Sequence, residues 1–238
     1  MSLRAEGAAI SGYMKKVSKL LSVIFILVGF ILVFSSSIPI LTYEIFTSRR
    51  LTKEKLLSPL PDSQKEQFTN ASPEGNLVKA SNWFEGAALS FEEIPSGVTY
   101  YNLSIPRLKI RNASVEIGGD DLSKNLIHYK GTALPGKKGN TVIFGHSTLP
   151  QLFKPDNYLS IFSTLPAMKK GDKIQLSFDG ITYTYKVDDI FEVKPNQVEI
   201  LNQKFDDSYL SVVTCVPPGT YLKRLVVRAR LVPPGSDI

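Results

Sequence analysis

The first strongly apolar stretch of the chain is LLSVIFILVGFILVFSSSIPIL, which occupies residues 20–41 and has no charged side chain. In a helix that rises about 1.5 Å per residue, about 20 apolar residues cross the hydrocarbon core of a bilayer. A cleaved signal peptide would use a shorter apolar region, here Leu20 to Phe34, followed by the three serines that begin at Ser35. The full uncharged length favours an uncleaved transmembrane anchor.

From residue 98 onward, apolar positions fall in short, often alternating runs separated by glycine and proline, which is typical of β-strands. The clearest hairpin is KIQLSFDGITYTYKVDDIFEV, in which Asp179-Gly180 supplies a two-residue turn between alternating strands. The other runs are YYNLSI, ASVEI, NLIHY, TVIFGH, YLSVVTC and RLVVRARLV. About eight strands at this spacing predict a mainly β domain, either a barrel or a sandwich, and we expect a short helix within DNYLSIFSTLPAMKKGD.

The stretch between the anchor and the β domain differs in composition from both. LTYEIFTSRRLTKEKLL can continue the anchor helix, whereas SPLPDSQKEQFTNASPEGN is polar, lacks an apolar period and reads as a tether. Trp83, Phe84 and Phe91 interrupt this polar pattern, and we expect them to dock on the domain that follows. We therefore divide the chain into a cytoplasmic segment (1–19), a transmembrane anchor (20–41), a juxtamembrane helix with a polar linker (42–97) and the β domain (98–238).

The net charge of +6 suits a protein near an anionic membrane or cell wall. No run of lysines with interleaved aromatics is present, so nucleic acid is not an expected partner. Four basic residues precede the apolar stretch and four follow it: Arg4, Lys15, Lys16 and Lys19, then Arg49, Arg50, Lys53 and Lys55. The preceding group lies closer to the apolar edge, which favours a cytoplasmic N-terminus and a single-pass membrane protein whose β domain is extracytoplasmic.

Cys215 is the only cysteine, so it is either a small buried hydrophobe or a nucleophile. A thiol attacks as the thiolate, and at a reference pKa of about 8.5 it is mostly protonated at neutral pH, so a nucleophilic cysteine needs a histidine or a cation beside it. His146 ends the apolar run GNTVIFGH, and Gly145 before it permits a sharp turn and leaves room for a ligand. His128 lies in mid-strand, where a structural role is expected.

The strand RLVVRARL carries arginine at positions 224, 228 and 230 on one face and only apolar residues on the other. An ordinary half-buried strand with a solvated basic face explains Arg228 and Arg230. If this strand pairs antiparallel with SVVTC, however, Arg224 lies beside Cys215. A fixed guanidinium at that place can donate hydrogen bonds to an oxyanion.

Two stretches in this order resemble the sortase family: GTALPGKKGNTVIFGH upstream and TCVPPGTYLKRLVVR downstream, preceded by an apolar N-terminal anchor. Sortases are membrane-anchored cysteine transpeptidases of mainly Gram-positive bacteria, and the resemblance covers about residues 98–232. It implies an eight-stranded β-barrel. It also implies that Cys215 is the nucleophile, His146 the general acid/base, and Arg224 the group that holds substrate and stabilises the oxyanion.

The resemblance further implies cleavage of a Leu-Pro-x-Thr-Gly-like sorting signal through a Cys thioacyl intermediate. The surface protein is then transferred to an amine, either of a cell-wall precursor or of a pilin lysine. Thr214 matches the threonine that precedes the family's cysteine and would assist at the same oxyanion, and apolar candidates for the signal groove are Val198, Ile200 and Leu201. We expect no cofactor and no metal site.

This chain departs from the family pattern in two places. Family members usually carry Thr-Leu-x-Thr-Cys, where this chain has SVVTC, and pilus-assembling members often carry an Asp-Pro-aromatic lid, where this chain has Asn82-Trp83-Phe84. There are three alternatives to this interpretation. One is a cell-surface β domain that binds wall or protein partners and has an inert Cys215, and another is a hydrolytic cysteine protease in which water replaces the amine. The third is a structural membrane protein, which leaves the order of the cysteine, histidine and arginine unexplained.

Overall fold

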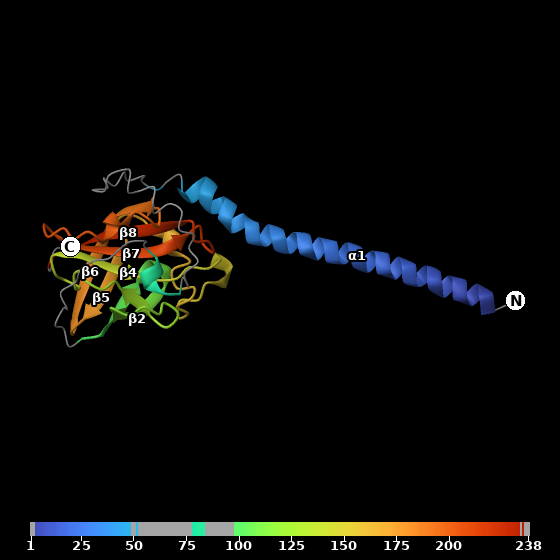
Figure 1. Cartoon of the computed structure of the whole chain (residues 1–238), viewed down its shortest axis with the longest axis horizontal. Helices are drawn as coiled ribbons and strands as arrows, with labels where there is room; N and C mark the ends of the chain where they lie inside the picture. The colour runs from blue at the N-terminus through green and yellow to red at the C-terminus, as the bar shows by residue number, and fades with distance from the viewer. Residues whose placement is uncertain (1–2, 49–50, 52–77, 84–97, 234, 236–238) are drawn as a thin grey trace. The chain divides into compact units, whose positions relative to one another are not determined.

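The computed structural model describes residues 3–48, 51, 78–83, 98–233 and 235, with side chains from residue 18 onward (Figure 1). The chain separates into two compact units, Met1–Thr42 and Tyr43–Ile238. The first contains α1, Leu3–Thr42. Within it begins the stretch Ser18–Thr47, which is long and apolar enough to cross a membrane, with a mean hydropathy of 2.6 in its most apolar window. This finding is consistent with the expected anchor.

The second unit is a closed eight-stranded barrel, so of the two predicted architectures the barrel is confirmed and the sandwich is wrong. Around the barrel the strands follow the order β1-β2-β3-β4-β7-β8-β6-β5. Their bounds are β1 Tyr100–Ile105, β2 Ile110–Ile117, β3 Leu126–His128, β4 Gly139–Phe144, β5 Lys173–Phe178, β6 Ile181–Val193, β7 Ser208–Val216 and β8 Lys223–Leu231. Each predicted run is a strand, and the β5–β6 hairpin turns at Asp179 and Gly180, both with positive φ.

Short helices occupy the connections. The 3-10 helices are Ala80–Asn82, Pro106–Leu108, Pro150–Leu152, Leu165–Ala167 and Val198–Leu201. The expected helix in DNYLSIFSTLPAMKKGD is thus the single turn Leu165–Ala167, which begins at a leucine followed by proline. A π-helix, Tyr43–Thr47, opens the second unit, and the Tyr43 side chain is buried in the barrel core while its hydroxyl donates to Glu192 at 2.7 Å.

Strand alternation divides the apolar residues between two clusters. Side chains on one face of β7 and β8, among them Leu210, Val212, Leu225 and Val227, fill the barrel interior. Those on the opposite face belong to a second cluster, here named the outer cluster. Its buried members are Ala80, Trp83, Leu122, Ile127, Val142, Phe144, Phe191, Val193, Ile200, Leu201, Val213, Cys215 and Val226.

The outer cluster exists because the segment between β6 and β7 and the segment around Trp83 both cover the outside of β4, β7 and β8. Ala80 N–H donates to the carbonyl of Asp120, and Leu122 N–H donates to the carbonyl of Val78, so Val78–Trp83 is fixed to the β2–β3 connection. The expected docking of Trp83 is therefore confirmed, and its side chain is fully buried. Phe84 and Phe91 lie outside the described residues.

Candidate active site

Cys215 lies near the end of β7, directly opposite Arg224 on β8. β7 and β8 lie side by side in the barrel (Figure 1). They pair antiparallel over eight residue pairs, Tyr209 with Arg230 through Val216 with Lys223, and Cys215 is the Cα partner of Arg224. This is the register expected from the sequence. The cysteine side chain is on the outer face and only 2% exposed.

His146 follows the end of β4, which runs parallel to β7 with Phe144 opposite Val213. The residues on either side of His146 bind β7 directly. Gly145 N–H donates to the carbonyl of Val213 at 3.2 Å, and the Ser147 hydroxyl donates to the carbonyl of Cys215 at 2.6 Å. Two parallel strands that end together thus bring His146 alongside Cys215. The contact through Ser147 had no signal in the sequence.

The reason for the glycine before His146 differs from the expectation. A Cβ at Gly145 would lie 2.4 Å from a ring carbon of Phe162 and 2.6 Å from a methyl of Leu126. The space is therefore filled by the barrel's own side chains, and the expectation that Gly145 leaves room for a ligand is wrong. Glycine is needed there because the connection packs closely on the end of β4.

Arg224 is almost fully buried, and its guanidinium donates hydrogen bonds to three backbone carbonyls. Nη1 donates to the carbonyls of Tyr221 at 3.0 Å and Lys223 at 3.4 Å, and Nη2 donates to the carbonyl of Trp83 at 3.2 Å. The guanidinium carbon also lies 5.3 Å from the centre of the Trp83 ring. A peptide substrate also presents carbonyl oxygens. The Trp83 carbonyl therefore occupies an Arg224 N–H donor that a substrate carbonyl could otherwise bind.

Trp83 covers the histidine as well. Its ring lies 5.8 Å from the His146 ring and 5.4 Å from the Phe144 ring, on which it stacks. His146 is 9% exposed, and its Nε2 makes no hydrogen bond to any described residue. An unpaired ring nitrogen beneath an indole is available for proton transfer once that cover moves.

Burial sets the protonation of both groups. It raises the pKa of the Cys215 thiol to about 11, and the positive charge of Arg224 opposes that rise only in part. Burial also lowers the pKa of His146, against the opposing effect of the Asp121 carboxylate. In this closed arrangement a neutral thiol therefore faces a neutral imidazole at neutral pH.

Thr214 and the three candidate groove residues occupy different faces. The Thr214 hydroxyl donates to the carbonyl of Gly145 at 2.7 Å, so it joins β7 to the end of β4 on the side away from the cysteine. Ile200 and Leu201 are buried in the outer cluster, and Val198 packs against it. Among the residues that the structure describes, no group of three or more His, Cys, Asp or Glu side chains is arranged to hold a metal ion.

Comparisons with known proteins agree with this geometry. The Sortase domain model matches residues 103–232, more than half of the chain. Sortase A of Streptococcus agalactiae is 36% identical over 76 residues, which cover 32% of this chain and 30% of that protein. Sortase A of Bacillus anthracis is 30% identical over 133 residues, which cover 54% of this chain and 60% of that protein. The matches thus span less than two thirds of both relatives.

Among solved structures, sortase A from Corynebacterium diphtheriae superimposes with a TM-score of 0.51 at 29% identity, covering 59% of this chain and 64% of that one. The residues that the Sortase domain model matches include the second half of β1 and all of the other seven strands. They also include Cys215, His146 and Arg224. The closed eight-stranded barrel and the Sortase domain match over more than half of the chain show that the chain belongs to the sortase family.

Proposed function

We propose that the protein is a membrane-anchored cysteine transpeptidase that joins a surface protein to an amine acceptor. The observation that carries this proposal is the convergence of three groups at one end of the outer sheet face. Cys215 pairs with Arg224 across two antiparallel strands, and His146 follows the parallel strand on the other side of β7. Nucleophile, oxyanion donor and proton carrier then come from three adjacent strands of one rigid barrel.

The reaction proceeds in two acyl-transfer steps. The Cys215 thiol gives its proton to His146 and attacks the carbonyl of the threonine in a Leu-Pro-x-Thr-Gly-like signal. Arg224 stabilises the resulting oxyanion. The C–N bond breaks, the glycine amine leaves with a proton from His146, and a thioester remains on Cys215. An acceptor amine then attacks the thioester, loses its proton to His146 and releases the thiol.

The closed arrangement supports a resting state that opens before catalysis. Moving Trp83 away would free the Arg224 Nη2 donor and let water reach the thiol and the imidazole. Hydration lowers the thiol pKa and raises the imidazole pKa, so proton transfer from sulfur to nitrogen becomes easier. Binding of the sorting peptide over the outer cluster supplies the free energy for that displacement.

Localisation and partners follow from the same proposal. The apolar helix anchors the chain once in the cell membrane, with the barrel outside the cytoplasm. Its substrates are surface proteins with a C-terminal sorting signal, and its acceptor is an amine of a peptidoglycan precursor or a pilin lysine. One observation favours the wall-binding alternative: Cys215 is buried, and its raised pKa keeps the thiol protonated at neutral pH.

The test uses the full chain in detergent micelles with a Leu-Pro-x-Thr-Gly peptide and an amine, analysed by mass spectrometry. We expect an amide product together with a thioacyl adduct on Cys215, and neither in the Cys215→Ala variant. Folded Cys215→Ala with wild-type product formation would refute the proposal. A hydrolysed peptide without amide product, even at high amine concentration, would identify a cysteine protease instead.

A further inference from the structure

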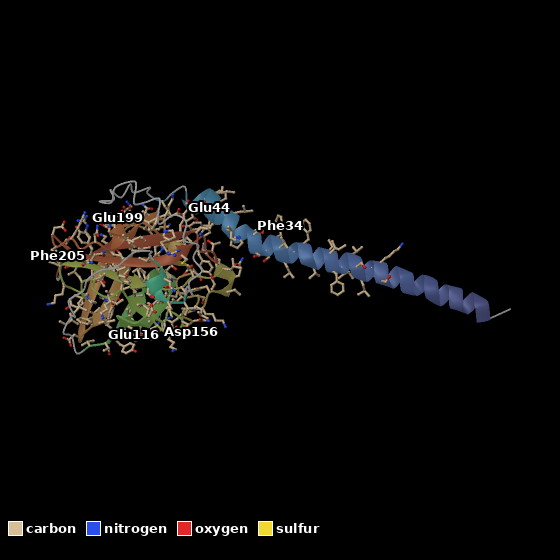
Figure 2. All side chains as sticks on the ribbon, in the orientation of Figure 1. Phe34, Glu44, Glu116, Asp156, Glu199 and Phe205 are labelled. Atoms are coloured by element: carbon tan, nitrogen blue, oxygen red, sulfur yellow. The ribbon has the colours of Figure 1, made fainter. Side chains whose placement is uncertain are left out.

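A polar pocket adjoins the apolar outer cluster on the same sheet face. Its volume is about 390 Å³, and its walls include Ser211 and Tyr209 from β7, Arg228 and Arg230 from β8, and Glu199 from the connection between β6 and β7. Glu199 is labelled in Figure 2. None of the three candidate catalytic residues lines this pocket.

The pocket lies along β7 from the candidate nucleophile. Cys215, Val213, Ser211 and Tyr209 alternate onto one face of the strand. At about 3.3 Å per residue, Ser211 lies about 13 Å and Tyr209 about 20 Å from Cys215 along the strand. An extended peptide advances at the same rate, so a residue four positions before the scissile carbonyl reaches the level of Ser211.

The part of the peptide before the scissile bond stays on the enzyme as the acyl group, and this acyl half is the part that follows β7 toward the pocket. His146 must reach the leaving amine, and it lies at the ends of β4 and β7. The acyl half therefore runs back along β7, over the outer cluster and toward Ser211. In a signal of the form Leu-Pro-x-Thr, the leucine is three residues before the scissile carbonyl, so the pocket meets the residue that precedes the leucine.

The floor of this pocket is already satisfied by internal hydrogen bonds. The Ser211 hydroxyl donates to Asn140 Oδ1 at 2.9 Å, and Asn140 Nδ2 donates to the carbonyl of Ile200 at 2.8 Å. Arg230 is ion-paired with Asp188 at 2.7 Å, and Arg228 with Asp189 at 3.5 Å. These contacts give the pocket its shape and pair both arginines with carboxylates, and Lys204 adds a further positive charge to the walls.

Glu199 is the exception among the walls. Its Oε2 is buried and has no hydrogen-bond partner among the residues that the structure describes. A carboxylate can only accept hydrogen bonds, so the Glu199 carboxylate favours a ligand that supplies an N–H over a ligand that supplies none. A ligand carboxylate would be repelled by Glu199, an aliphatic side chain would give it no hydrogen bond, and a ligand ammonium would face Lys204.

We propose that this pocket binds the primary amide side chain of an asparagine or glutamine that immediately precedes the sorting signal. The amide N–H donates to Glu199, and the amide carbonyl faces the arginine side of the pocket. The inference rests on the proposed function for its peptide direction, and it adds a specificity site beyond the four residues of the signal.

The experiment uses the full chain in detergent with four peptides, Gln-, Leu-, Lys- and Glu-Leu-Pro-x-Thr-Gly, which differ only at the first residue. We expect kcat/KM for the Gln peptide to exceed that for the Leu peptide by about tenfold, with the Glu peptide poorest. Glu199→Ala should abolish the Gln preference, so that the Gln and Leu peptides react at equal rates. Asp156→Ala removes an exposed carboxylate from another loop and should keep the preference.

A second measurement separates this inference from the proposed function. Binding of the same peptides to the Cys215→Ala chain, followed by fluorescence anisotropy, needs no turnover. A Gln preference in binding that Glu199→Ala removes supports the pocket even if no peptide is cleaved, in which case only the proposed function fails. Turnover with equal rates for Gln and Leu peptides, or a preference that survives Glu199→Ala, overturns the pocket assignment and leaves the transpeptidase intact. Absence of both turnover and binding overturns both.

Discussion

Arg224 and Arg230 stand on the same face of β8, six residues apart, yet different partners hold them. Arg230 is more than half exposed and pairs with the carboxylates of Asp188 and Asp207. Arg224 is 2% exposed, and its guanidinium donates hydrogen bonds to the carbonyls of Tyr221, Lys223 and Trp83. A guanidinium paired with a carboxylate is already neutralised, whereas one that is held by carbonyl dipoles keeps its charge for an oxyanion. The partners, and not the face of the strand, distinguish the two roles.

The two histidines repeat this contrast. His128 is fully buried on β3, where its ring bonds to the Tyr101 hydroxyl at 2.9 Å and to the Thr132 hydroxyl at 3.0 Å, so both nitrogens are occupied. His146 is buried beneath Trp83 and keeps Nε2 without a hydrogen bond among the described residues. Complete pairing indicates a structural histidine, and an unpaired nitrogen beside a thiol indicates a reactive one.

The largest expected effect concerns these histidines. His146→Ala should lower kcat by about 10²–10⁴-fold with little change in thermal stability, because it removes the proton carrier. The measurement is the transpeptidation rate together with the unfolding midpoint. His128→Ala, the control, should act mainly on stability. The reverse pattern would contradict both assignments.

His128 also predicts how stability depends on pH. Burial lowers its pKa to about 4 from an ordinary 6.5, so the unfolded chain binds this proton and the folded chain does not. The contribution to the free energy of unfolding is intact above pH 6.5 and is lost as pH falls toward 4, by about 3 kcal/mol. Urea unfolding between pH 4 and 7 measures it. A loss of the same size in His128→Ala would show that other groups cause it.

The next effect concerns the two arginines. Arg224→Lys keeps a positive charge but loses the planar fork, so we expect kcat to fall by about 10²-fold or more. Arg230→Ala should lower kcat far less, because Arg230 lies six residues along β8 from Arg224, which faces Cys215. It should also change stability little, because exposed ion pairs contribute little to the free energy of folding. Transpeptidation rates of the two variants under one condition test the comparison. Greater impairment in Arg230→Ala would require a site built around the other end of β8.

Removing the Trp83 side chain, which covers the site, should have the opposite effect and make Cys215 more reactive. Trp83→Ala should hydrate Cys215 and bring its pKa down from about 11 toward about 8.5, which increases the thiolate fraction at pH 7 by up to about 300-fold. Iodoacetamide alkylation of Cys215, followed by mass spectrometry from pH 6 to 10, should become faster and shift to lower pH. Tyr221→Ala, in an exposed residue of the β7–β8 connection, is the matched control. Unchanged alkylation in Trp83→Ala would mean that burial of the thiol does not depend on this cover.

The sequence by itself determined the strands and the identity of the candidate site residues. Alternation, the Asp179-Gly180 turn and the spacing of glycine and proline are local signals, and each predicted strand is present. The position of Arg224 opposite Cys215 also followed from the sequence, because a short connection between two strands restricts them to an antiparallel pair with adjacent ends.

Only the tertiary structure decided the surroundings of those residues. The parallel pairing of β4 with β7 joins segments that are far apart in the chain, and no local pattern encodes such a contact. The Trp83 carbonyl on Arg224, the Phe162 ring against Gly145 and the unpaired Glu199 oxygen are likewise long-range results of packing. Burial and the charge of Arg224 set the pKa of the Cys215 thiol, and both act on it only because distant segments of the chain share one surface.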